Sequence, residues 1–177
     1  MFEGWGEFYL MAGSSAAVLI GLIFVVVTLM HDKPRSTVLD GARLYMGPVV
    51  LQVSFVLVLS AAALAKGVTP GVTGLTAAGV AIWGLARAVQ SALGIRRRGQ
   101  RDGEETPHWT DQWFYGVVPG ALYALLGAVA LALWAALAWA PQALAAVITA
   151  MLLNAIRNEW DLVTWLAPRP DRTEEGD

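Results

Sequence analysis

Polar residues near the end of the chain carry most of its capacity for chemistry. The stretch MLLNAIRNEWDLVTW begins at Met151 as an apolar segment and then acquires several amide and charged residues. At about 100° per residue, one narrow stripe of a helix would hold Asn154, Asn158, Asp161 and Trp165, with Arg157 at its edge and Glu159 pointing nearly the opposite way. Amides beside a carboxylate and a guanidinium can bind ions or join helices through hydrogen bonds.

A single arginine in another apolar segment is the expected partner of this stripe. Arg87 is the sole charged residue between Gly71 and Gly94, and it lies at a depth similar to that of Arg157. We predict that Arg87 meets Asp161 or Glu159 in a charge cluster at the inner leaflet of a membrane. The members of this cluster would be Arg87, Arg157, Glu159 and Asp161. It is either a network that locks helices together or a polar path or ligand site, and both interpretations stay open.

Further polar residues lie inside apolar segments. Each is expected to form a hydrogen bond between helices more readily than to line a pore. These residues are Gln52, Ser54, Ser60 and Gln90.

Composition indicates a membrane protein. Of the 177 residues, 56% are hydrophobic and 15% are charged, a balance that is typical of polytopic membrane proteins. A net charge of -2 argues against a nucleic acid partner. The chain has no cysteine, and its imidazoles are His31 and His108, both in polar segments. We therefore expect no disulfide, no metal site and no cofactor.

Five apolar segments are long enough to cross a membrane, because a spanning helix needs about 20 residues. We predict spans at residues 8–30, 44–65, 71–94, 113–140 and 142–165. The predicted fold class is an all-α integral membrane protein, with one five-helix domain over residues 1–166 and a polar cytoplasmic tail over 167–177. The uncharged part of the last span, from Pro141 to Ile156, covers about 24 Å. Since the hydrocarbon core measures about 30 Å, the fifth helix should carry charges into the membrane boundary.

Basic residues set the expected orientation. With five spans, Lys66 is the sole basic residue on the side of the N-terminus. The other side holds Lys33, Arg35, Arg43, Arg96, Arg97, Arg98, Arg101, Arg169 and Arg172. Positive residues favour the cytoplasm, so we predict an external N-terminus and a cytoplasmic C-terminus in the inner membrane of a bacterium. No basic region or cleavage pattern precedes or follows the first apolar run, so this span should be retained.

Aromatic residues fall near both predicted membrane surfaces, as expected for amphipathic rings at the level of the headgroups. The outer group is Trp5, Phe8, Tyr9 and Trp139, and the inner group is Trp109, Trp113, Phe114, Tyr115, Trp160 and Trp165.

Small residues and prolines indicate how the helices pack. Gly13, Ala17 and Gly21 recur every four residues, a spacing that lets two helices approach closely in lipid. The first helix is therefore expected either at the centre of the bundle or at a subunit contact. Pro48 and Pro119 should loosen or kink the second and fourth helices.

The segments FYLMAGSSAAVLIGLIFVVVTL and IRNEWDLVTW carry a further signal. They resemble a widespread family of small, uncharacterised bacterial integral membrane proteins, which open with an aromatic pair, a Gly-Ser-rich turn and a Gly-Leu-x-Phe-Val run and close with His-Asn-x-Trp-Asp. The matching residues are Phe8, Tyr9, Gly13, Ser14, Ser15, Gly21, Phe24, Val25, Pro119, Asn158, Trp160 and Asp161. The resemblance implies no activity. Arg157 stands where the family has histidine, so a titratable proton relay is not expected there.

Function is narrowed by what the chain lacks. It has no HExxH or GxSxG motif and no cluster of cysteine or histidine, and Glu159 and Asp161 face different directions. We expect no enzymatic activity. The favoured function is that of a subunit in an oligomeric channel or pore for ions or small solutes, lined by the stripe near the cytoplasmic side. The alternative is a non-conducting accessory or regulatory protein that packs against a membrane protein partner. Expected contacts are the lipid bilayer and, for the channel, further copies of the chain in a homo-oligomer.

Overall fold

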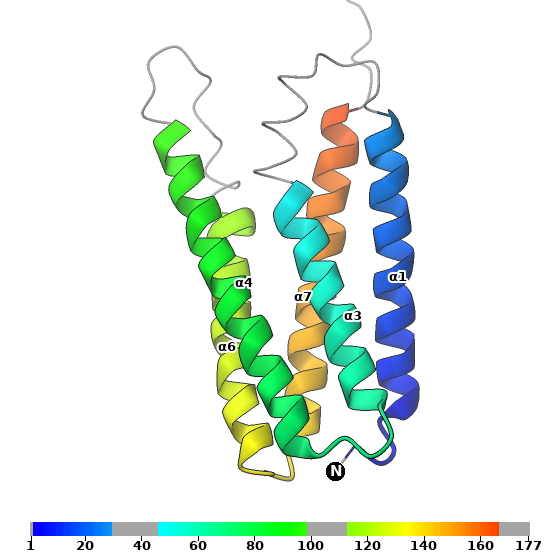
Figure 1. Ribbon diagram of the computed structural model, residues 1–177. Coiled ribbons are helices and arrows are strands. Elements are labelled where there is room, and N and C mark those ends of the chain that lie inside the picture. Colours follow the sequence, from blue (N-terminus) through cyan, green and yellow to red (C-terminus); the bar gives the residue numbers. More distant parts are fainter. Residues whose placement is uncertain (1, 30–45, 99–112, 167–177) are drawn as a thin grey trace, which may run out of the picture.

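A computed structural model of the chain describes residues 2–29, 46–98 and 113–166, which form a bundle of long helices (Figure 1). The elements are α1 (Gly6–Leu29), α3 (Gly47–Leu64), α4 (Pro70–Arg98), the short π-helical turn η2 (Trp113–Val117), α6 (Val118–Trp134) and α7 (Ala140–Leu166). Five segments are long and apolar enough to span a membrane, with η2 and α6 acting as one. The prediction of five apolar helices is confirmed, and the predicted tail over 167–177 lies outside the described residues.

The helices alternate in direction along the chain. α1, α4 and α7 run one way and α3 and α6 the other, so the start of the described chain lies at the same end as the turns after α3 and α6 (Figure 1). α1 packs against α3, and α4 packs against α6. α7 contacts α1, α3 and α6, and α3 also contacts α4, so both α7 and α3 join the two pairs. α1 packs against α3 and α7 alone among the larger contacts, so it does not lie at the centre of the bundle, and its alternative position at a subunit contact stays a prediction.

Large apolar side chains cover the outside of the bundle. Phe24, Ile82 and Leu131 each expose more than 70% of their surface, and Leu10 and Trp83 expose more than 60%. A soluble protein rarely exposes apolar patches on this scale. Hydrocarbon tails would cover the same side chains at no cost, so the surface suits a multi-pass membrane protein.

α4 and α6 approach each other most closely through glycines. A side chain at Gly74 would lie 3.0 Å from the carbonyl oxygen of Ala130, and one at Gly84 would lie 2.3 Å from the ring of Tyr123. The Tyr123 ring in turn packs edge-on against Phe55 of α3, with ring centroids 5.9 Å apart. These contacts let two backbones pack without intervening side chains, which is how small residues favour helix association in lipid.

The predicted glycine stripe on α1 is divided between two environments. Gly13 is buried, and a side chain there would lie 3.2 Å from Ser60 of α3. Ala17 and Gly21 are exposed, and nothing lies within 4 Å of the position that a side chain on Gly21 would occupy. The face of α1 that packs inside the bundle instead carries Tyr9 and Ala16.

α6 ends earlier than its apolar sequence predicts. The amide of Leu137 bonds the carbonyl of Ala132, and the amide of Ala136 bonds the carbonyl of Leu133, each at 3.0 Å. This pattern is a Schellman motif, with Ala136 in the left-handed region at φ 52°. The helix therefore stops at Trp134, and the predicted span of 113–140 is too long at its C-terminal end.

Two prolines lie in first turns of helices, where a missing amide is tolerated. Pro48 follows Gly47 at the start of α3, and Pro119 follows Val118 at the start of α6. Pro48 is thus the second residue of α3, and whether it kinks a longer helix depends on residues before 46, which lie outside the described part of the chain. Pro119 comes directly after η2, where the helical hydrogen bonding changes register.

Candidate functional site

The predicted stripe lies on α7, and its two asparagines face the interior of the bundle. Asn154 and Asn158 are 7% and 2% exposed. Arg157 and Asp161 lie at the edge of the bundle, with side chains 34% and 41% exposed. The side chain of Trp165 lies outside the described part of the structure. The periodicity therefore predicted the shared face correctly, but its members differ in their access to the surroundings.

Asn154 ties α7 to α3 through Gln52. The amide nitrogen of Gln52 donates to the carbonyl oxygen of Met151 at 2.7 Å, and Asn154 Nδ2 donates to Gln52 Oε1 at 3.1 Å. Both side chains are buried, and one hydrogen bond joins the two amides directly. Asn154 Oδ1 is buried without a hydrogen-bond partner in the described residues. The predicted helix-to-helix role of Gln52 is confirmed.

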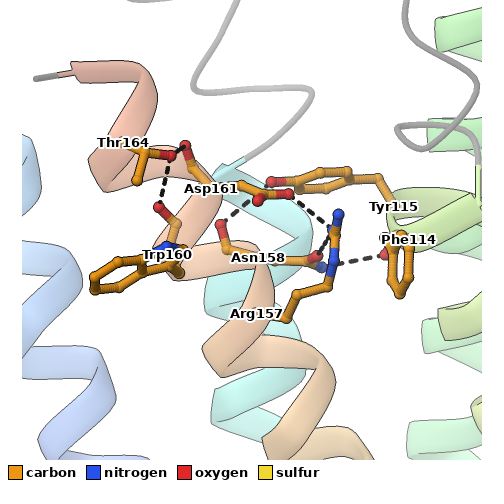
Figure 2. Close-up of polar contacts among 7 residues, drawn as sticks. All are labelled: Phe114, Tyr115, Arg157, Asn158, Trp160, Asp161 and Thr164. Carbon is orange, nitrogen blue, oxygen red and sulfur yellow. Dashed lines mark hydrogen bonds and ion pairs between the residues drawn. The ribbon is translucent and has the colours of Figure 1, made fainter.

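Asn158 connects α7 to η2 (Figure 2). Its Nδ2 donates to the carbonyl oxygen of Phe114 at 3.1 Å, and its own carbonyl oxygen accepts the hydroxyl of Tyr115 at 3.3 Å. In a π-helix each carbonyl bonds the amide five residues on, which for Phe114 is Pro119. Proline has no amide hydrogen, so the Phe114 carbonyl is left free and Asn158 supplies the donor.

Arg157 joins the buried and exposed parts of the site. Its Nη1 donates to Asn158 Oδ1 at 3.1 Å and forms an ion pair with Asp161 Oδ2 at 2.8 Å (Figure 2). The guanidinium also lies 3.5 Å from the centre of the Phe114 ring, a cation–π contact. The arginine is thus held by three partners on two elements.

The predicted ion pair of Arg87 is wrong. Arg87 is exposed and donates to Gln90 of its own helix at 3.1 Å, while Asp161 pairs with Arg157. The reason lies in the packing, because α4 packs against α6 and α3 whereas α7 packs against α1, α3 and α6. Equal depth along two helices does not make them neighbours. Within the described residues, Gln90 bonds Arg87 of its own helix and no other helix.

The remaining polar residues behave differently from one another. Glu159 is half-buried, and its Oε1 atom has no hydrogen-bond partner within the described part of the chain. Trp160 is exposed, and its carbonyl accepts the hydroxyl of Thr164 at 3.1 Å. Ser54 bonds the carbonyl of Val50 in its own helix. The hydroxyl of Ser60 is buried without a partner in the described residues, so the expected bonds of Ser54 and Ser60 between helices are not formed.

Two tyrosines that the sequence analysis expects near the membrane surfaces are buried within the bundle. Tyr9 is fully buried, and its hydroxyl donates to the carbonyl oxygen of Pro141 at 2.8 Å, which fastens α1 to the start of α7. Tyr115 is buried beside Asn158. Their aromatic character gave no indication of these bonds. The one sequence feature that could have indicated a free carbonyl at Phe114 is Pro119, because proline has no amide hydrogen to bond it.

The chemistry of this arrangement is that of hydrogen bonding and charge pairing. Among the described residues, no group of three or more His, Asp or Glu side chains could hold a metal ion. No protein-family model, curated protein or solved structure matches the chain. The site therefore has to be interpreted from its own geometry.

Proposed function

We propose that the chain is a non-conducting accessory or regulatory protein of a bacterial inner membrane, which packs against another membrane protein. The observation that supports this proposal is that the amides of Asn154 and Asn158 are buried and hydrogen-bonded to neighbouring elements. Side chains that line a path for ions or solutes need to face water. Here the same side chains hold α7 against α3 and η2, which favours a locking network over a pore lining.

The proposed orientation places the N-terminus outside and the C-terminus in the cytoplasm. Lys66 is the basic residue near the turn after α3, whereas Arg96 lies near the opposite end of the bundle together with the other arginines of the α4 terminus. This asymmetry supports a cytoplasmic location for the end that holds Arg157 and Asp161.

A channel subunit remains the second candidate, because one observation favours it. Arg157 and Asp161 are 34% and 41% exposed within a predicted span, so a charged pair is accessible at the edge of the bundle. In a ring of copies such pairs could face a shared path. A charged side chain that faces acyl chains costs about 2.5–3.5 kcal/mol at the bilayer centre. Contact of this pair with another protein chain or with water is therefore favoured over contact with lipid.

Ion flux distinguishes the two functions. The purified full chain is reconstituted into liposomes, and the flux of monovalent cations and anions is measured for the wild-type protein and for Asp161→Asn. We expect no flux above that of protein-free vesicles, with an added ionophore showing that the assay responds. A selective flux that Asp161→Asn reduces would establish the channel and refute the accessory function.

The mass of the complex in a mild detergent is the companion measurement. Extraction from native membranes should give a particle larger than one chain and its detergent. A monodisperse monomer from intact membranes would contradict the proposed association with another membrane protein.

A further inference from the structure

Glu159 is the acidic residue of α7 that the network around Asn158 does not use. Its Oε1 atom is buried and has no hydrogen-bond partner in the part of the chain that the structure describes. Asp161, two residues further on, is ion-paired with Arg157 at 2.8 Å. Two carboxyl groups in the same turn of one helix therefore differ in their partners: Asp161 has a cation beside it, and Glu159 Oε1 has no hydrogen-bond donor among the described residues.

Helical geometry places Glu159 on the side of α7 that faces α1. Pro141 lies on this side, because its carbonyl accepts the hydroxyl of Tyr9. Glu159 follows Pro141 by about five full turns, so the two residues share a face of the helix. α1 and α7 run in the same direction and contact each other (Figure 1).

Among the described residues, the elements packed against α7 offer this carboxyl no cation. α3 has no titratable residue, and η2 and α6 have Tyr115 and Tyr123. α1 has Glu7 and Tyr9, both near its start and about 27 Å below the level of Glu159. On α7 itself, Arg157 is held by Asp161, Asn158 and Phe114.

We infer that Glu159 is a proton-binding site of the bundle, neutral in the folded protein and reactive toward an apolar carbodiimide. A carboxylate with a buried oxygen and no donor would lose much of its hydration, and this cost is avoided when the group keeps its proton. Asp161 differs from Glu159 in this respect, because its carboxylate has the guanidinium of Arg157 as a partner at 2.8 Å. The proton at Glu159 lies at the contact between α7 and α1, where its loss would introduce a charge beside an apolar helix.

Dicyclohexylcarbodiimide tests the protonation state directly. The carboxyl group gives its proton to a nitrogen of the reagent, and the carboxylate oxygen adds to the central carbon to form an O-acylisourea. Transfer of the acyl group from oxygen to nitrogen then gives a stable N-acylurea. No group leaves, so the protein gains the mass of the whole reagent.

The full chain in liposomes is treated near neutral pH and mapped by mass spectrometry. We expect roughly tenfold more adduct at Glu159 than at Asp161. A tenfold difference in the protonated fraction of two carboxyl groups corresponds to about one pH unit. Glu159→Gln should abolish the adduct, and Asp161→Asn, the matched control, should leave it in place. Equal labelling of both acids, or labelling of neither in a folded sample, would overturn the inference.

Thermal unfolding across pH gives a second measurement. From about pH 5 to about pH 9, above the range in which an exposed glutamate ionises, the wild-type protein should lose melting temperature relative to Glu159→Gln. The reason is that at high pH the folded protein has to hold an uncompensated charge, which glutamine lacks. Asp161→Asn should keep the wild-type trend. Parallel curves for wild-type and Glu159→Gln would show that Glu159 binds no proton of consequence.

Discussion

At the scale of single residues, the site depends on a carbonyl that the backbone leaves free. The π-helical turn η2 directs the Phe114 carbonyl toward position 119, where proline has no amide hydrogen. Asn158 supplies the missing donor from α7 at 3.1 Å. Asn158 therefore compensates for the amide that Pro119 lacks, which gives a physical reason for a polar side chain in this apolar interface.

Asn158→Ala should destabilise the protein by about 1–3 kcal/mol, because it leaves the partly buried Phe114 carbonyl without its donor from α7. Arg157 would lose an acceptor at the same time. Thermal unfolding in detergent measures the loss. Gln90→Ala is the control, since Gln90 is an exposed amide that accepts a hydrogen bond from Arg87 of its own helix. If both variants lose equal stability, the proposed importance of the Phe114 bond is wrong.

The sequence predicted these residues better than it predicted their partners. Periodicity put Asn154, Asn158 and Asp161 on one face, and burial follows that face at the two asparagines. The partner of a polar side chain depends on which helices are neighbours, and the depth of a residue along its helix does not tell this. Arg87 shows the limit, because it matches Arg157 in depth but lies on a helix that packs mainly against α6.

At the scale of elements, the bundle is built from the pairs α1–α3 and α4–α6, which are joined by α7 and by the contact of α3 with α4. The α4–α6 pair packs through a row of small buried residues on α4 at alternating spacings of three and four, namely Gly74, Ala77, Ala81, Gly84, Ala88 and Ser91. This row was present in the sequence and is longer than the Gly13, Ala17 and Gly21 row. Ala17 and Gly21 are exposed. This could not be predicted, because the spacing of small residues does not tell which face of a helix turns inward.

Gly84→Ala should lower the stability of the bundle by about 1–3 kcal/mol through overpacking. The added carbon would lie 2.3 Å from the ring of Tyr123, which is buried and also packs against Phe55. The ring cannot move without disturbing α3. Thermal unfolding in detergent is the measurement.

Gly79→Ala is the matched control on the same helix. Gly79 is exposed, and nothing lies within 4 Å of the position of the added carbon. Because alanine is the better helix former, this variant should be neutral or slightly stabilising. A loss at Gly79 as large as that at Gly84 would mean that close packing of α4 on α6 is not the cause.

At the scale of the whole molecule, the alternation of helix directions gives the bundle two chemically different ends. The turns after α3 and α6 lie at one end with the start of the described chain, and Arg96 lies near the other (Figure 1). The order and direction of the helices follow from the lengths of the apolar segments, which is why they could be predicted. The pairing of the helices could not, because every helix presents apolar side chains on several faces.

The orientation of these ends in the membrane can be tested with single cysteines, since the natural chain has none. Lys66→Cys and Ala138→Cys place a thiol at exposed positions in the two turns, and Arg96→Cys places one near the opposite end. In intact cells a membrane-impermeant maleimide should label Lys66→Cys and Ala138→Cys. It should label Arg96→Cys only once the cells are permeabilised, because arginine-rich ends stay in the cytoplasm. The reverse pattern would invert the bundle and move Arg157 and Asp161 to the external face. Labelling of Lys66→Cys without Ala138→Cys would show that α4 and the η2–α6 segment do not both cross the membrane.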